Sequence, residues 1–122
     1  MANTFRVVTF AAEPASAGTP YTMYTTPGST TTVVIGLILA NIHTAAVTVE
    51  VELVSDTATG VNTGAPVANG TAFLTKDVTI PAGSSLELLT GGKVILQTTD
   101  ILKVDCSVAD KVSGTLSIME IT

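Results

Sequence analysis

The chain has 122 residues, of which 46% are hydrophobic and only 12% are charged, and its formal net charge at pH 7 is -5. This length fits one domain with a single apolar core, and the excess of acidic side chains argues against a protein that grips nucleic-acid phosphates. A charged fraction below the roughly 25% usual in soluble proteins indicates a surface partly covered by copies of the chain or by a larger assembly.

The first twenty residues are expected to form an N-terminal arm, followed by a β-sandwich domain over residues 21–122. Residues 5–10 have the pattern of a short strand, whereas residues 11–20 are rich in Ala, Ser, Gly and Pro. Because the backbone donors of a strand need partners wherever it lies, this strand can pair with its own sheet, with a neighbouring subunit or with a larger assembly. The sequence leaves these three pairings open.

Strand patterns continue along the rest of the chain, separated by turn residues. The alternation of Val or Leu with Thr or Glu over residues 46–54 is typical of a half-buried antiparallel strand. The continuous apolar run over residues 31–42 predicts burial on both faces or a strand that crosses the interior, with Gly36 marking a bulge or a close backbone contact. Further strands are expected over residues 21–26, 71–80, 84–89, 93–97, 101–108 and 112–121.

The spacing of these strands predicts the fold class. Turn signals recur roughly every 8 to 12 residues, and no amphipathic helix pattern of useful length interrupts them. We therefore predict an all-β chain: a single β-sandwich, jelly-roll or immunoglobulin-like, of about eight or nine short antiparallel strands with an extended N-terminal arm. Residues 55–70 carry several Gly and Pro without periodicity, which predicts a loop of unusual length, and such loops are usually functional or disordered.

The residues that could perform chemistry do not assemble into a site. His43 is the only histidine and cannot form a zinc site without acidic partners from elsewhere. Glu50 and Glu52 lie on one polar strand face and so have similar environments. A general acid and a general base need carboxylates in different environments. We expect no catalytic residue, no metal site and no cofactor.

The single cysteine and the N-terminus bear on where the chain is made. Cys106 excludes an internal disulfide and fits synthesis in a reducing compartment, where a buried thiol acts as a small hydrophobe. The N-terminus lacks the basic and apolar segments of a secretory signal. The longest apolar run, residues 33–40, is far shorter than the about 20 residues of a membrane helix. Neither nucleic acid nor a membrane is an expected partner.

Two stretches, residues 30–53 and 78–122, resemble small structural proteins of tailed bacteriophages, especially phages of cyanobacteria and other aquatic bacteria. That group includes proteins of heads, necks and tails, and the resemblance implies a non-enzymatic virion component. The resemblance is carried by a Thr-rich lead into Val33-Val34-Ile35-Gly36-Leu37 with Ala40-Asn41, by the turn Ile80-Pro81-Ala82-Gly83-Ser84-Ser85-Leu86, and by the ending Ile118-Met119-Glu120-Ile121-Thr122.

Within that group, the size, acidity and low charge of the chain most resemble capsid decoration, or cement, proteins. The resemblance implies a homo-oligomer, as a trimer, bound to the major capsid protein or another virion protein, and a virion location after synthesis in the host cytoplasm. On this interpretation a chain without residues 2–18 stays folded but no longer binds capsids. The arm and the loop over residues 55–70 then supply the contacts, at Phe5, Arg6, Val7, Val8, Phe10, Val61 and Pro66.

Two other functions remain open. A neck, tail or fibre-associated structural protein fits the same residues. A carbohydrate-binding module for host adsorption is the alternative from another class, although the 4% aromatic content is low for a protein that stacks sugars on exposed rings.

Overall fold

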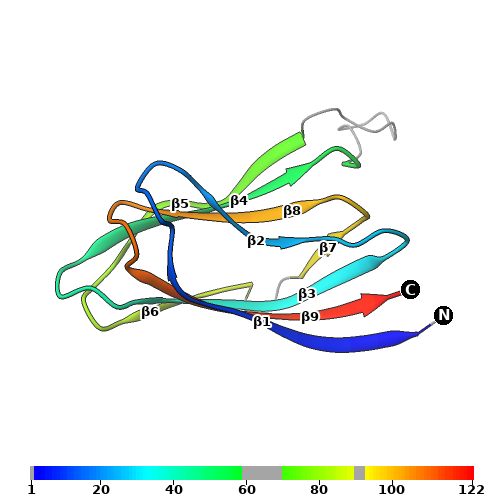
Figure 1. Ribbon diagram of the computed structural model, residues 1–122, viewed down its shortest axis with the longest axis horizontal. Helices are drawn as coiled ribbons and strands as arrows, with labels where there is room; N and C mark the ends of the chain where they lie inside the picture. Colours follow the sequence, from blue (N-terminus) through cyan, green and yellow to red (C-terminus); the bar gives the residue numbers. More distant parts are fainter. Residues whose placement is uncertain (1, 59–69, 90–92) are drawn as a thin grey trace.

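The computed structural model describes residues 2–58, 70–89 and 93–122, and it shows two antiparallel sheets packed face to face (Figure 1). The first sheet contains, in spatial order, β1 (Asn3–Glu13), β9 (Val112–Ile121), β3 (Thr31–Asn41) and β6 (Ser85–Leu88), and β7 (Val94–Leu96) also pairs with β3. The second sheet contains β2 (Tyr21–Thr25), β8 (Ile101–Cys106), β4 (Val47–Ser55) and β5 (Gly70–Ile80). The described residues thus form nine strands, which confirms the predicted all-β sandwich.

The strands pair as one long hairpin rolled onto itself. β4 pairs with β5, β3 with β6, β2 with β8 and β1 with β9, so each strand of the first half meets its counterpart from the second half. Successive pairs alternate between the two sheets. This is the arrangement of a jelly roll, and it decides between the two sandwich types that the sequence left open. No helix in the described ranges is long and apolar enough to cross a membrane.

Most of the segment expected as an N-terminal arm forms β1, which pairs with β9 from Asn3 to Glu13. Ala2 and Thr122 exchange backbone hydrogen bonds of 3.1 and 2.9 Å, so the two ends of the chain lie together (Figure 1). Of the three pairings left open, the structure has the one with the chain's own sheet. β1 also carries Phe10, only 8% exposed, into the core. The structure therefore speaks against a folded chain without residues 2–18.

The predicted burial of residues 31–42 on both faces is wrong. Val34 and Leu37 point into the sandwich and are fully buried, whereas Ile35 and Ile38 are 39% and 43% exposed on the outer face. The register between β3 and β9 shifts between Val34 and Gly36, which confirms the bulge predicted at that glycine. A bulge bends its strand and re-aims the side chains that flank it.

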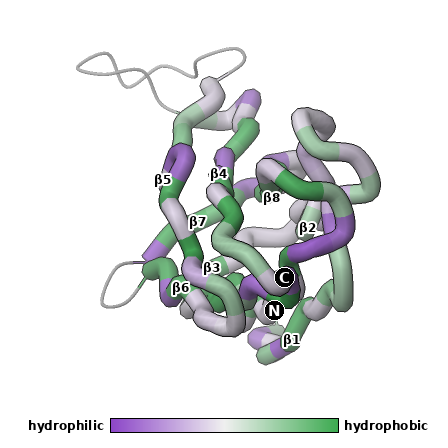
Figure 2. Tube along the Cα trace, turned by 90° about the vertical axis from the view of Figure 1, so that its left-hand side faces the viewer, coloured by the Kyte–Doolittle hydropathy of each residue, from purple (hydrophilic) through white to green (hydrophobic). Residues whose placement is uncertain are grey.

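The core lies between the sheets and is built by strands that alternate inward apolar and outward polar residues. Hydrophobic positions recur along the strands of both sheets when the molecule is turned by 90° (Figure 2). The alternation predicted for residues 46–54 is confirmed, because every second side chain of β4 from Val47 to Val51 is at most 2% exposed. The inward residues of the other long strands join them: Leu39, Leu96, Leu102, Val104, Cys106, Val112, Leu116 and Ile118.

Gly114 on β9 offers a test of how β1 docks on the core. A Cβ built on Gly114 would lie 2.2 Å from Cζ of Phe10, so Gly114→Ala must displace that ring. We expect the free energy of unfolding, measured in urea, to fall by about 2 kcal/mol, as for an overpacked core. Gly36→Ala is the matched control, because a Cβ there meets nothing within 4 Å. Equal stability of the two variants would contradict this packing.

Candidate interaction surface

An apolar row crosses the outer face of the first sheet. Residues that pair across neighbouring strands lie on the same face of a sheet. The strand registers place Phe5 of β1, Met119 of β9, Val33 of β3 and Ile95 of β7 side by side. Phe5 is 73% exposed and Ile95 is 62% exposed. Large apolar side chains therefore project into solvent at both ends of this row.

The rows beside it are also apolar or carry uncharged polar groups. Val7, 63% exposed, pairs with Ser117, and Ile38 pairs with Thr115 on one side and with Glu87 on the other. Glu87, at the β6 edge, is the one charged residue that the described registers place on this surface. We call this surface the apolar face; its residues are Asn3, Phe5, Val7, Thr9, Thr31, Val33, Ile35, Ile38, Ala40, Ser85, Glu87, Ile95, Ser113, Thr115, Ser117, Met119 and Ile121.

A hollow of about 290 Å³ opens in the apolar face between β9, β3 and β6. Ile35 and Ile38 line it from β3, Thr115 and Ser117 from β9, and Leu89 follows β6. The bulged segment of β3 also contributes a glycine to the lining, so no side chain projects there. The hollow thus has apolar and hydroxyl-bearing walls with one carboxylate, Glu87, at the β6 side. β1 runs along the other side of β9.

The outer face of the second sheet differs, because it is charged. Glu52 pairs across the sheet with Lys103, and the Lys76 ammonium lies 3.2 Å from a carboxylate oxygen of Glu50 and 4.6 Å from the ring centroid of Phe73. The Lys76–Glu50 ion pair contributes little to stability, but these charged groups keep this face hydrated. The two outer faces of the sandwich therefore present different chemistry to solvent.

A second hollow, of about 380 Å³, lies on the charged side and has acidic walls that include Glu50, Asp77 and Asp105. Oδ1 of Asp105 accepts hydrogen bonds from the backbone N–H groups of Gly18, at 3.1 Å, and Cys106, at 2.9 Å. This carboxylate is thus engaged by the chain itself. Among the described residues, no three His, Cys, Asp or Glu side chains are grouped to hold a metal ion.

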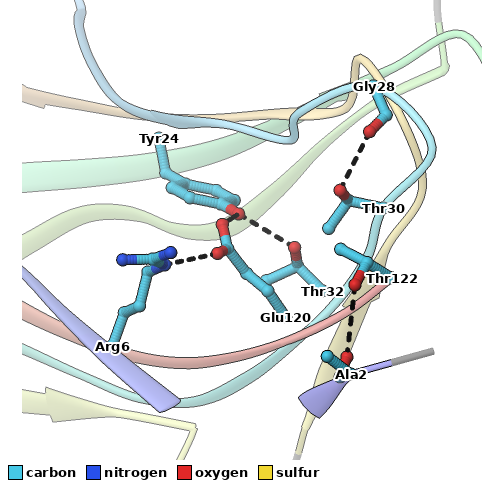
Figure 3. A network of polar contacts seen from close by, with 8 residues as sticks. All are labelled: Ala2, Arg6, Tyr24, Gly28, Thr30, Thr32, Glu120 and Thr122. Atoms are coloured by element: carbon cyan, nitrogen blue, oxygen red, sulfur yellow. Dashed lines mark hydrogen bonds and ion pairs between the residues drawn. The ribbon is translucent and has the colours of Figure 1, made fainter. Parts of the chain in front are cut away.

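A polar cluster at one end of the sandwich fixes which side chains of β1 point inward (Figure 3). Glu120 points inward from β9 and is 8% exposed. Tyr24 of β2 donates a hydrogen bond of 2.6 Å to one carboxylate oxygen, and Arg6 of β1 donates to the other. The Tyr24 hydroxyl also lies 2.9 Å from Oγ1 of Thr32 on β3. Three strands from both sheets therefore meet at one carboxylate, and β3 joins the cluster through Tyr24.

The same contacts shift two pKa values in opposite directions. The hydrogen bond from Tyr24 holds the pKa of Glu120 below its ordinary value, with the Arg6 guanidinium adding to this effect and burial opposing it. Burial, and then the hydrogen bond to Glu120, raise the pKa of Tyr24 from 10.0 to about 12. The pair is therefore held as carboxylate and neutral phenol at neutral pH.

The structure divides the contact residues expected on β1 between two faces. Phe5 and Val7 project from the apolar face. Arg6 faces the other way and pairs with Glu120, Val8 packs against the core, and Phe10 is part of it, with its ring centroid 5.3 Å from that of Tyr21.

The other expected contacts, Val61 and Pro66, lie outside the described residues. Sequence reasoning missed Ile35, Ile38 and Ile95, which belong to the apolar face. The available signal was the bulge predicted at residue 36: a bulge in a long apolar run turns some of its side chains outward.

Comparison with known proteins bears on the fold alone. No family model and no curated protein sequence matches the chain. A chain of the T13 viral particle of infectious bursal disease virus is similar, with a TM-score of 0.53 and 12% identity over 97% of this chain and 30% of that chain. A Bacillus endospore appendage is similar with a TM-score of 0.47 and 16% identity, over 99% of this chain and 87% of that chain. The viral match shows a shared sandwich fold, and the present chain spans less than a third of that viral chain.

The Tyr24–Glu120 pair predicts a pH-dependent stability. Because the folded pKa of Glu120 is lowered, its contribution is present above the ordinary value of 4.5 and is lost as pH falls through the lowered value. Tyr24→Phe should reduce the free energy of unfolding at neutral pH by about 1 to 2 kcal/mol. The difference from the unaltered chain should shrink in acid. The stabilisation that involves Tyr24 depends on pH in the opposite direction: it is present below pH 10.0 and is lost as pH rises through the raised pKa of about 12.

Urea unfolding between neutral pH and values below 4.5 measures this difference. Tyr21→Phe is the matched control, since it removes a phenol hydroxyl from the same strand and keeps the ring that packs on Phe10. A difference between Tyr24→Phe and the unaltered chain that stays constant with pH would contradict the assignment.

Proposed function

We propose that this chain is a non-enzymatic structural component of a virus particle. The observation that carries the proposal is the apolar face: an exposed apolar surface, poor in charge, on one sheet of a jelly roll. Apolar patches of this kind mark protein contact sites, and burying them contributes roughly 25 cal/mol per Å² removed from water. The sandwich fold shared with a chain of a viral particle supports the same conclusion by analogy of fold.

The buried carboxylates support a structural role as well. Asp100, 4% exposed, accepts hydrogen bonds from the Ser55 hydroxyl at 2.7 Å, from the Thr57 hydroxyl at 2.8 Å and from the backbone N–H of Gln97 at 3.0 Å. These bonds tie the end of β4 to the turn before β8. With Glu120 committed to Tyr24 and Arg6, both of these acids hold the fold together.

Within the virion, we assign the chain to decoration of the outer head lattice of a tailed phage, as a cement protein that acts as an oligomer. The partner is the major capsid protein or another virion protein. β1 ends the first sheet, and within the described residues only β9 pairs along it. Its second row of backbone donors and acceptors is therefore available to a strand of the partner. Contacts at Phe5 and Val7, and at Val61 and Pro66, which lie outside the described residues, complete the proposal.

The copy number of the chain in purified particles tests this assignment. Quantitative mass spectrometry against the major capsid protein should give a ratio near one or a simple large fraction of one, because a cement protein follows the symmetry of the head lattice. A handful of copies per particle would move the chain to the neck or tail. Absence from particles would overturn the virion proposal.

A further inference from the structure

We propose that the apolar face is a self-association surface: two copies of the chain pack these faces together, so that Phe5 of each copy packs against Ile95 of the other and Val7 enters the other's hollow. This inference deepens the proposed function, on which it rests only in treating the chain as an assembling structural protein. It names a second copy of the chain as the occupant of the hollow between β9, β3 and β6.

The distribution of charge favours a second copy. Each chain carries a net charge of -5, so two copies repel one another in most orientations. The outer face of the second sheet carries Glu50, Glu52, Lys76 and Lys103, whereas the registers place only Glu87 on the apolar face, at the β6 edge. Facing the two apolar faces together is therefore the approach that brings the fewest charges into contact.

The shapes on the apolar face complement each other. Phe5 and Val7 project from β1, at 73% and 63% exposure, on one side of β9, and the hollow of about 290 Å³ lies on the other side, between Ile35 and Leu89 in the row of Val7. A cavity of about 150 Å³ is enough to admit a benzene ring, so the hollow has room for the smaller Val7 side chain. A projection and a matching hollow on one surface are what a self-complementary contact requires.

A twofold axis in the plane between the two sheets, running along the strands between β9 and β3, satisfies both conditions. It places β1 of each copy over β6 and β7 of the other and β9 over β3. The registers then bring Phe5 over Ile95 of the other copy, and Val7 over the hollow beside Gly36. The two Glu87 side chains then lie at opposite edges of the contact, away from each other. Aligned sheets pack face to face at about 10 Å in this way inside β-sandwiches.

The extent of the apolar face is sufficient for a specific dimer. Four strands spaced by about 4.8 Å, over about nine residues of about 3.4 Å each, cover on the order of 600 Å² per copy. The two copies together bury on the order of 1,200 Å², which is the lower limit of stable, specific interfaces. A dimer of moderate affinity follows, and this twofold contact differs from the trimer expected from the resemblance, which needs two different surfaces per copy.

Light scattering coupled to gel filtration tests the proposal on the purified full chain without any virus particle. The unaltered chain should show twice the 12.4 kDa of one copy. Phe5→Glu should reduce the mass to that of one copy, because it places a charge against Ile95 of the other copy. Phe73→Glu is the matched control: it also replaces an exposed phenylalanine on a strand, but on the charged face, and should leave the dimer intact.

Gly36→Val provides an independent variant in case Phe5→Glu unfolds the chain. A Cβ at this position meets nothing within 4 Å in the single chain, so the fold should tolerate the side chain while the hollow is partly filled. We expect the dimer to dissociate at a protein concentration at least tenfold higher, with an unchanged circular dichroism spectrum.

A monomeric unaltered chain at high concentration, a trimer mass that survives Phe5→Glu, or equal effects of Phe5→Glu and Phe73→Glu would each overturn the proposal. Its failure can be told apart from failure of the proposed function. A monomer found in particles at high copy number would remove the pairing and keep the virion role. A dimer that is absent from particles would do the reverse.

Discussion

The pairing of β1 with β9 decides what the first sheet presents to solvent. Arg6 binds Glu120, and Phe10, further along β1, fills the space beside Gly114. Both side chains therefore lie on the inner side of β1. Because side chains alternate along a strand, Phe5 and Val7 are then directed outward. A slip of one residue would exchange the two sets and leave the core without the Phe10 ring. The apolar face therefore depends on the register of a single strand pair.

The polar cluster around Glu120 explains why this register is stable. A carboxylate that is nearly buried must have its hydrogen bonds satisfied, and here the partners come from β1 and β2, while Thr32 of β3 joins the cluster through the Tyr24 hydroxyl (Figure 3). Tyr24 contributes more than Arg6, because the Arg6 side chain is 58% exposed and its ion pair is screened by water. The cluster thus joins the two sheets at the end where the chain termini meet.

The sandwich has two outer faces, and the chain uses them differently. The second sheet places charged side chains and the Lys76–Glu50 ion pair toward solvent, so hydration of this face is favourable. The first sheet exposes Phe5, Val7 and Ile95, and the hydration of these apolar side chains is unfavourable. This difference is the physical basis for assigning partner contacts to one face and solvent to the other, and it accounts for the low charge content of the whole chain.

Much of the local structure could be predicted from the sequence, because local features depend on neighbouring residues. The turn after β5 is an example: Gly83 has a positive φ of 72°, and the N–H of Ser84 donates to the carbonyl of Pro81 at 3.1 Å, as expected for this combination of residues. The alternation from Val47 to Val51 likewise predicted which side of β4 is buried.

The site depended on contacts between segments far apart in the chain. An apolar run such as residues 31–42 has the same sequence pattern whether one face of the strand or both faces are buried. The exposure of Ile35 and Ile38 could therefore not be predicted from it. The same holds for β1, whose strand pattern names no partner. The amino-acid sequence by itself determined the strands, the turns and the bulge at Gly36. Only the tertiary structure decided that β1 joins β9 and that an apolar face results, because strand pairing is a long-range choice made by packing.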